Sequence, residues 1–210
     1  WWNKVATYAQ RKPSPLNGFY LFNYMALIVC ARARDYAEIT FHKFADELEA
    51  KDAAGQYAFG APENEKHRVT WEGIAVWTYL GATFKGLKNQ GAVMTGSAYP
   101  GLWSLVYTPG DLESMAEAYT NVYINTCGPN RYEEFYKVVK NSKSDGIVLH
   151  LNRSCKLMGL LNNEGAEYVN AKMGVPYVSF DGDQTDPRVF TPAQYETRVQ
   201  ALTEMMDENQ

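Results

Sequence analysis

The sequence predicts an α/β fold, a doubly wound parallel sheet flanked by helices and preceded by an N-terminal helical segment. Two observations predict the sheet. From residue 67 onward, short apolar runs alternate with longer amphipathic stretches, and strands joined by helices of this length pair in parallel. Right-handed crossovers then place helices on both faces. A third observation, the helical spacing of apolar residues before this point, predicts the N-terminal segment.

Residues 1–60 are predicted to form the helical segment. Pro13 and Pro15 break any helix that begins near the start of the chain. From Tyr36 onward, apolar side chains recur at helical spacing, and charged side chains occupy the other faces. We expect that helix to end near Gly55.

Residues 61–210 are predicted to form the α/β domain. Glycine, proline and asparagine between residues 53 and 65 indicate a linker before it. Its strands are predicted at residues 67–71, 92–95, 146–151 and 175–180. Its helices are predicted at residues 77–90, 111–123, 131–143, 155–173 and 192–207, the last with Thr191 as its N-cap.

Composition excludes two classes of partner. The chain has 210 residues, of which 46% are hydrophobic and 21% charged, enough to bury a substantial core. Its net charge is -4 and its charges are interspersed, so it lacks the basic stripe that would bind nucleic acid. No apolar run approaches the roughly 20 residues of a spanning helix, so no membrane segment is expected.

Cysteine usage and the first residues bear on location. The three cysteines are widely spaced and form neither an even disulfide framework nor a CxxC pair, which favours a reducing compartment. The first residues contain neither a basic region nor an apolar signal core, so we expect no secretory signal among them. The cytoplasm is the expected location.

The loops that follow the four strands are the expected place for a ligand. Ligands of open parallel sheets bind beyond the carboxyl ends of the strands, where these loops converge. The four loops are polar and we predict that they lie along one edge. They cover residues 71–73, 96–100, 152–156 and 181–188. The candidates for substrate binding in them are Ser97, Tyr99, Asn152, Arg153 and Ser154.

Cys155 is the strongest chemical candidate on this edge. It is predicted to lie in the first turn of a helix, where the helix dipole, Arg153 and Lys156 favour a thiolate over a thiol. A thiolate is the form that binds metal or attacks an electrophile. The alternative is an inert buried cysteine, but its polar and cationic neighbours argue against that interpretation.

His150 and an acidic loop are weaker candidates. His150 ends the third predicted strand between two leucines, and the residues leave open both a core imidazole and a catalytic one. Asp181, Asp183 and Asp186 are spaced as divalent-cation ligands can be, but no glutamate completes the set. We expect these aspartates to cap helices and form turns.

Several stretches carry a resemblance to a known family. They are DGIVLHLNRSCK at residues 145–156, VPYVSFDGD at 175–183, DPR at 186–188, RVTWEGIAVW at 68–77 and GSAY at 96–99. The Asn-Arg-Ser-Cys-Lys element followed by Asp-Gly-Asp is specific. On these residues the chain resembles the 2-hydroxyacyl-CoA dehydratase family, which includes benzoyl-CoA reductase subunits, over nearly its whole length.

The resemblance implies a longer subunit that contains an iron–sulfur cluster. Family members are roughly double this length and hold a [4Fe–4S] cluster through cysteines between two α/β domains. Cys155 carries over as one ligand, and the others would come from an N-terminal domain to which residues 1–60 would join. Cys30 and Cys127 match no ligand position of the family. We therefore predict that the chain alone binds iron poorly or not at all.

The resemblance also implies a reaction and its partners. Family members eliminate water from (R)-2-hydroxyacyl-CoA to give 2-enoyl-CoA. The β-proton is hardly acidic, so ordinary base-catalysed elimination has no stabilised carbanion to form. Reduction of the thioester carbonyl to a ketyl radical lets the hydroxyl leave and acidifies that proton. The implied partners are a related second subunit in a heterodimer and an ATP-dependent iron–sulfur activator.

Three other functions remain open. The first is an aryl-CoA reductase subunit of the benzoyl-CoA type, which shares the architecture. The second is a non-catalytic subunit that relays electrons or supports its partner. The third is a nucleotide-binding flavodoxin-like domain, but no loop contains GxGxxG or a P-loop. The acyl group also stays open among lactoyl, phenyllactoyl, 2-hydroxyglutaryl and branched-chain substrates.

Overall fold

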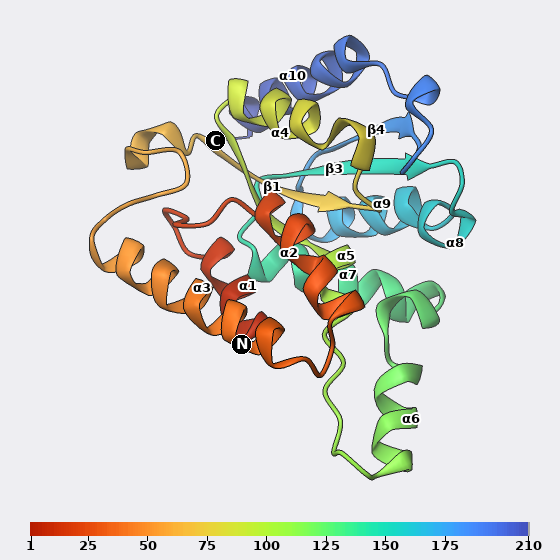
Figure 1. Cartoon of the computed structure of the whole chain (residues 1–210). Helices are drawn as coiled ribbons and strands as arrows, with labels where there is room; N and C mark the ends of the chain where they lie inside the picture. Colours follow the sequence, from red (N-terminus) through yellow and green to blue (C-terminus); the bar gives the residue numbers. More distant parts are fainter. Residues whose placement is uncertain (210) are drawn as a thin grey trace.

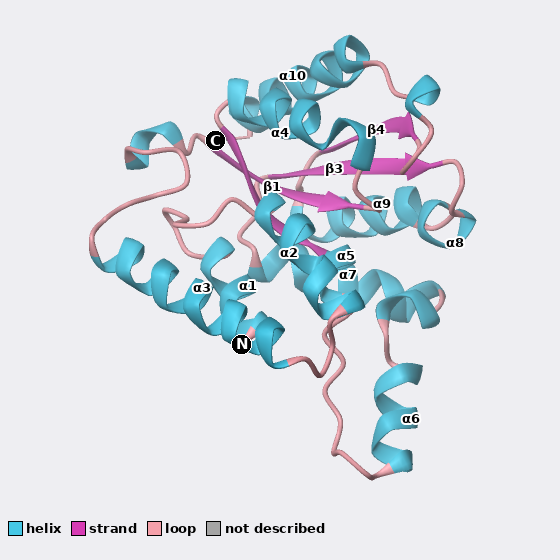
Figure 2. Cartoon of the chain, in the orientation of Figure 1, coloured by secondary structure: helices cyan, strands magenta, loops and turns pink. Residues whose placement is uncertain are grey.

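A computed structural model describes residues 1–209 as a four-stranded parallel sheet with helices on both faces (Figures 1 and 2). The strand order is β2-β1-β3-β4, so β1 and β3 are central. The strands are β1 (His67–Glu72), β2 (Ala92–Ser97), β3 (Gly146–Asn152) and β4 (Tyr177–Gly182). The predicted α/β fold class is confirmed.

The four strands lie where the sequence predicts them, with shifted ends. Each continues one or two residues beyond its predicted last residue. The fourth begins at Tyr177, later than predicted, because Pro176 has no N–H for the ladder and uses only its carbonyl, which accepts from the Ile147 N–H at 2.9 Å. Burial on both faces explains why β3 is mostly apolar without strict alternation, and all six residues of β1 are buried although four of them are polar or charged.

Ten α-helices and four single 3₁₀ turns are assigned within the described residues. The first five helices are α1 (Trp2–Ala9), α2 (Phe19–Cys30), α3 (Asp35–Ala53), α4 (Leu80–Asn89) and α5 (Ala98–Gly101). The others are α6 (Leu112–Thr120), α7 (Gly128–Asn141), α8 (Lys156–Gly159), α9 (Asn162–Met173) and α10 (Pro192–Glu208). The 3₁₀ turns are η1 (Pro62–Asn64), η2 (Trp77–Tyr79), η3 (Tyr123–Asn125) and η4 (Pro187–Val189).

Helices cover the two faces of the sheet in pairs. Helices α4 and α10 contact each other and one face, and α7 and α9 contact each other and the opposite face (Figure 1). Strand β3 divides its side chains accordingly. Ile147 and Leu149 join the cluster under α7 and α9, and Val148 joins the larger cluster on the other face. This alternation is the two-residue period of a strand.

The N-terminal helices share the larger core with the sheet. The rings of Phe19 and Phe22 lie 5.6 and 6.2 Å from the ring of Trp71 in β1. The Gly18 N–H donates to the carbonyl of Met94 in β2 at 2.8 Å. One hydrophobic cluster contains side chains from both sides of residue 60, so the two predicted domains share a core. The boundary expected there stays a prediction.

Two predicted helices are divided or begin differently. The prediction of one continuous helix over residues 155–173 is wrong. Leu160 and Leu161 are not helical and separate α8 from α9. Two asparagines follow the break, and asparagine favours helix ends over helix interiors. The helix predicted from Trp77 begins as the 3₁₀ turn η2 and becomes α-helical only at Leu80.

The remaining helices differ only at their ends. Asp111 is the N-cap of α6 and accepts from two backbone N–H groups, and this helix ends at Thr120. Helix α7 begins earlier than predicted, with a proline in its first turn. Thr191 is the N-cap of α10 as predicted, but its side chain makes no capping hydrogen bond to the described residues. Among residues 1–209, no helix has the length and apolar character needed to cross a membrane.

Candidate functional site

The four predicted loops lie along one edge of the sheet. All strand pairs are parallel, so the carboxyl ends of β1, β2, β3 and β4 point the same way. The loops after these strands therefore converge at this carboxyl edge, which confirms their predicted arrangement. Figure 1 shows that β3 leads into α8, with β4 beside β3. The candidate site is built from these loops.

Cys155 lies on this edge, one residue before α8. Its side chain is partly buried and packs against the larger core cluster. The helix that follows is a single turn of four residues, so the helix dipole invoked from the sequence is largely absent. The backbone instead fixes the residue, because the Cys155 N–H donates to the Asn152 carbonyl at 3.3 Å and the Cys155 carbonyl accepts from the Gly159 N–H.

Asn152 holds two of the loops together. Its side chain is buried, and its Oδ1 accepts from the Ser154 N–H at 3.4 Å and the Gln184 N–H at 3.2 Å. One amide oxygen thereby joins the loop that carries Cys155 to the loop after β4. The Ser154 hydroxyl also donates to it at 3.2 Å. Arg153 extends outward, with its guanidinium 3.8 Å from the Asp181 carboxylate.

Ser97 and Tyr99 lie at the end of β2, on the same edge of the sheet as Cys155. Ser97 is the last residue of the strand and the N-cap of α5, and Tyr99 is buried. Burial raises the pKa of the Tyr99 phenol, and the nearby charge of a Cys155 thiolate raises it further. The structure thus brings Ser97 and Tyr99 to the edge that carries Cys155. Their part in binding substrate stays a prediction.

His150 lies below the edge, wholly buried in the core. Its Nδ1 hydrogen-bonds the Ile74 carbonyl, and its ring stacks on Phe180 with centroids 5.1 Å apart. Burial lowers the pKa of the imidazole, which favours the neutral form. Gly73 has φ +103, and a Cβ there would lie 2.5 Å from the His150 carbonyl oxygen. These contacts are those of an imidazole that packs in the core. The catalytic role of His150 stays a prediction.

The acidic loop after β4 forms turns and a cap, as expected. Asp183 accepts from the N–H groups of Thr185 and Asp186, both at 2.9 Å, and these bonds hold the pKa of its carboxyl well below the usual range. Asp186 caps η4 by accepting from the Arg188 N–H at 3.0 Å. The hydrogen bonds from Arg188 lower the pKa of Asp186 to about 2.

Glu72, Tyr123 and Arg131 form a buried group that sequence reasoning missed. Glu72 ends β1 with no exposed surface, and the Tyr123 hydroxyl donates to its Oε1 at 2.9 Å. Burial raises the pKa of Glu72 to about 7 despite that bond and the charge of Arg131. The Arg131 guanidinium lies 4.7 Å from the centroid of the Tyr123 ring. An acidic residue directly after the first predicted strand, residues 67–71, was the available signal.

Several buried polar atoms on or under this edge have no hydrogen-bond partner among the described residues. They belong to side chains at the ends of β1, β2 and β3 and to Arg131. Buried polar groups are nearly always paired with protein or with ordered water, so these atoms are groups that water or a ligand can bind at this edge. The atoms are Glu72 Oε2, Ser97 Oγ, Arg131 Nε, His150 Nε2 and Asn152 Nδ2.

The residues present fit one side of an iron–sulfur site. Cys155 is partly exposed on an edge rich in unpaired polar atoms, and a thiolate is the ligand that such clusters use. Within residues 1–209, no three cysteine, histidine or acidic side chains come close enough to hold a metal ion. Cys30 and Cys127 are exposed at the end of α2 and before α7. Any cluster on Cys155 therefore needs ligands from outside the described chain.

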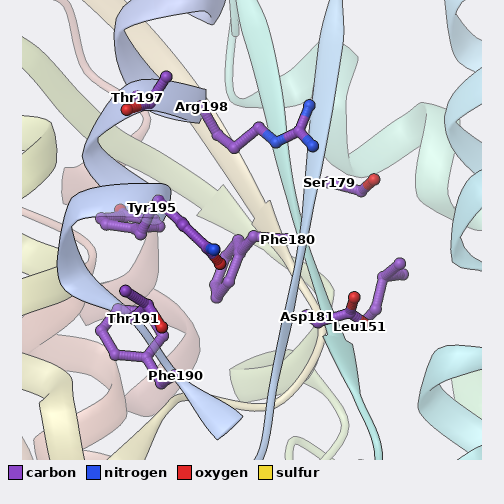
Figure 3. Close-up of a pocket in the computed structure, with 10 residues that line it drawn as sticks. Leu151, Ser179, Phe180, Asp181, Phe190, Thr191, Tyr195, Thr197 and Arg198 are labelled. Carbon is purple, nitrogen blue, oxygen red and sulfur yellow. The ribbon is translucent and has the colours of Figure 1, made fainter.

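A pocket of about 420 Å³ adjoins the site between β4 and α10 (Figure 3). Figure 3 shows Phe180 directed toward Tyr195, and their ring centroids are 4.9 Å apart. Asp181 lines this pocket and also faces Arg153 at the carboxyl edge. Asp181, near the carboxyl end of β4, is therefore common to the pocket and to that ion pair.

Comparison with known proteins identifies relatives along the whole chain. The family described as 2-hydroxyglutaryl-CoA dehydratase, D-component, matches residues 1–206. The chain is 61% identical over 210 residues to lactoyl-CoA dehydratase subunit alpha of Anaerotignum propionicum, covering 99% of this chain and 49% of that protein. It is 42% identical over 208 residues to the (R)-2-hydroxyisocaproyl-CoA dehydratase alpha subunit of Clostridioides difficile, covering 99% and 50%.

A more distant relative is named for a different activity. A benzoyl-CoA reductase subunit of Thauera aromatica is 23% identical over 211 residues, covering 95% of this chain and 49% of that protein. The chain thus spans about half the length of the curated relatives it matches.

Proposed function

Because the chain belongs to the 2-hydroxyglutaryl-CoA dehydratase D-component family, we propose that it is part of an α-type subunit of a 2-hydroxyacyl-CoA dehydratase. In this proposal Cys155 supplies one ligand to a [4Fe–4S] cluster. The rest of the subunit supplies the other ligands, since the chain spans half the length of its relatives. A related second subunit and an ATP-dependent iron–sulfur activator complete the proposed enzyme.

One observation carries the proposal. Cys155 shares the carboxyl edge of the sheet with buried polar atoms that no described residue satisfies, among them Ser97 Oγ and Asn152 Nδ2. A hydroxyl and an amide N–H are donors for a thioester carbonyl or for cluster sulfur. A structural cysteine in an apolar core would have no such neighbours. This edge therefore resembles one side of a binding site more than an ordinary solvent-exposed surface.

The chain's own residues would bind and orient. Asn152 would keep the Cys155 loop in place, because its Oδ1 accepts hydrogen bonds from the backbone N–H groups of Ser154 and Gln184. Ser97 and Tyr99 would face the acyl group, and exposed Arg153 would face the anionic part of the coenzyme. When bound, the cluster would supply the single electron that converts the thioester carbonyl to a ketyl radical. This electron chemistry would allow water to be eliminated from the 2-hydroxyacyl-CoA.

We propose a short 2-hydroxyacyl-CoA as the substrate, with lactoyl-CoA first among those to be tried. The support is identity, since the relative named lactoyl-CoA dehydratase is 61% identical and the one named for 2-hydroxyisocaproyl-CoA is 42% identical. The benzoyl-CoA reductase relative is 23% identical, which disfavours ring reduction. An anaerobic assay with lactoyl-CoA and benzoyl-CoA side by side separates the two reactions by their products.

The test of the proposed function is Cys155→Ser in the complete subunit that carries this chain. The variant is prepared anaerobically with partner, activator and ATP, and iron, sulfide and turnover are measured. We expect the cluster and dehydration to be lost with the fold and subunit pairing retained, because a serine oxygen is a poor ligand for iron–sulfur iron. Cys127→Ser is the matched control and should keep both.

A Cys155→Ser enzyme with full iron content and turnover would refute the assignment. If the cluster only relays electrons, adding substrate should leave its electron paramagnetic resonance spectrum unchanged. If the cluster contacts the substrate, adding substrate should change that spectrum.

A further inference from the structure

Arg131 is a buried arginine beneath the turn that follows Cys155. Only 1% of its surface is exposed, although it lies on α7 and not on the site loops. Its Nη1 donates to the Leu157 carbonyl at 2.8 Å, and its Nη2 lies 3.9 Å from the Met158 sulfur. Both partners belong to α8. The guanidinium therefore contacts the backbone two residues after Cys155.

The turn has few other anchors. Helix α8 is four residues long, and two leucines in and after it are largely exposed, Leu157 at 54% and Leu160 at 68%. Only Met158 in this turn is buried. Short exposed turns with few buried contacts open easily. Asn152 and the Gly159 N–H hold the Cys155 loop itself, and the bond from Arg131 to Leu157 holds the turn after it from a separate helix.

Tyr123 and Glu72 hold the guanidinium in place. A buried cation is costly unless an opposite charge or hydrogen-bond acceptors compensate it. The Tyr123 ring lies against the guanidinium, and its hydroxyl donates to Glu72 at the end of the central strand. The network runs from β1 through η3 and α7 to α8. It joins a central strand of the sheet to the turn beside Cys155.

We propose that Arg131 is a positioning residue for the Cys155 thiol, and that Tyr123 and Glu72 hold Arg131 for this task. Loss of the guanidinium frees the Leu157 carbonyl and lets the turn open. The value of this arrangement for a cluster rests on the proposed function. The effect on the thiol itself does not, because it follows from the contacts alone.

The test measures thiol reactivity in the purified 210-residue chain. The chain is treated with iodoacetamide, and mass spectrometry of the peptides gives separate alkylation rates for its three cysteines. Cys30 and Cys127 are exposed and serve as internal references. We expect Arg131→Met to raise the rate at Cys155, relative to Cys127, by about 10-fold, the size of effect that loss of a charged hydrogen bond allows. Arg131→Lys should restore part of the protection, and Tyr123→Phe should give a smaller increase.

The matched control is Arg68→Lys at the opposite edge of the sheet. Arg68 is as buried as Arg131, so this variant reports general loosening of the fold. An unchanged Cys155 rate in folded Arg131→Met, or an equal increase in Arg68→Lys, overturns the proposal. If circular dichroism shows that Arg131→Met does not fold, Arg131→Lys and Tyr123→Phe decide, since unchanged Cys155 rates in both overturn it equally.

A second measurement uses the cluster in the complete subunit. We expect Arg131→Lys to keep iron and to shift the electron paramagnetic resonance signal of the cluster, because the ligand loop is reoriented. An unshifted signal contradicts the proposal. The two proposals fail separately, since full iron in Cys155→Ser would remove the ligand assignment and leave the alkylation result intact.

Discussion

Arg68 and Arg131 are both buried arginines, but they lie at opposite ends of the sheet and differ in their partners. Arg68, near the start of β1, pairs with the Glu65 carboxylate and donates to the carbonyls of Gln10, Arg11, Ser142 and Lys143. All of its nitrogens are used. At the carboxyl end, Arg131 Nε has no described partner, and neither has Glu72 Oε2 nor Asn152 Nδ2.

The difference separates a structural edge from a functional one. A buried polar atom without a partner costs about 1 to 3 kcal/mol, so a fold keeps several only where something else offsets them. At the amino edge, where the strands begin, Arg68 donates hydrogen bonds to the segments at residues 10–11 and 142–143 and so joins them. Away from the carboxyl edge, atoms such as His67 Nδ1 and Asn17 Nδ2 also have no partner among the described residues. In the proposed function, this carboxyl edge is the side on which the rest of the subunit would complete the site.

The largest effect is expected at the amino edge. Arg68→Met removes one partner of a buried ion pair and leaves the Glu65 carboxylate without its charge partner. We expect a loss of about 3 to 5 kcal/mol in the free energy of unfolding, measured by urea denaturation. A loss below about 1 kcal/mol would mean that Arg68 does not stabilise this edge. The contrast drawn between Arg68 and Arg131 would then be wrong.

The next effect is a pH dependence that originates at the carboxyl edge. Burial raises the pKa of Glu72 from 4.5 to about 7, so between these values the folded chain binds more protons than the unfolded chain. The contribution of Glu72 to stability is therefore complete below pH 4.5 and is lost as the pH rises through 7. It amounts to at most about 3 kcal/mol.

Glu72→Gln should remove this slope. The measurement is the free energy of unfolding of both proteins from pH 4 to pH 8, taken as a difference. His150 contributes an opposite slope because burial lowers the pKa of its imidazole, but it is present in both proteins and cancels. A difference that is constant across this range would show that Glu72 is ionised in the fold, as in an ordinary surface carboxylate.

A smaller effect is expected at Gly73. Alanine there must adopt φ +103 and place its Cβ 2.5 Å from the His150 carbonyl oxygen. We expect a loss of about 2 to 3 kcal/mol from left-handed strain and backbone displacement. Gly174→Ala is the control, because Gly174 also has a positive φ but no atom lies within 4 Å of its Cβ position. Equal losses in the two variants would show that the close approach to His150 is unimportant.

Local patterns in the sequence predicted most of the sheet. Strand β3 is a mostly apolar run followed by a polar loop, so the pattern of residues alone places Cys155 at the carboxyl edge of the sheet. The helix after Cys155 was predicted too long. Its apolar residues Leu157 and Leu160 are exposed, so their spacing reflects a surface that the described chain leaves uncovered and not a helix packed on a core.

The network of Glu72, Tyr123 and Arg131 could not be predicted. Its members are 51 and 8 residues apart along the chain, and they meet only because η3 and α7 return over the end of β1. Nothing local distinguishes Arg131 from the exposed basic residues of the same helix. Sequence periodicity reports which face is buried, whereas hydrogen-bond partners depend on the three-dimensional crossing of distant elements.

Iron binding tests most directly whether the carboxyl edge is one side of a shared cluster site. The 210-residue chain and the complete subunit are reconstituted anaerobically with iron and sulfide in parallel, and both ions are counted per polypeptide. We expect a [4Fe–4S] complement on the complete subunit, lost in Cys155→Ser, and little or no iron on the 210-residue chain. A full cluster on the 210-residue chain, or on the complete subunit without Cys155, would contradict the account.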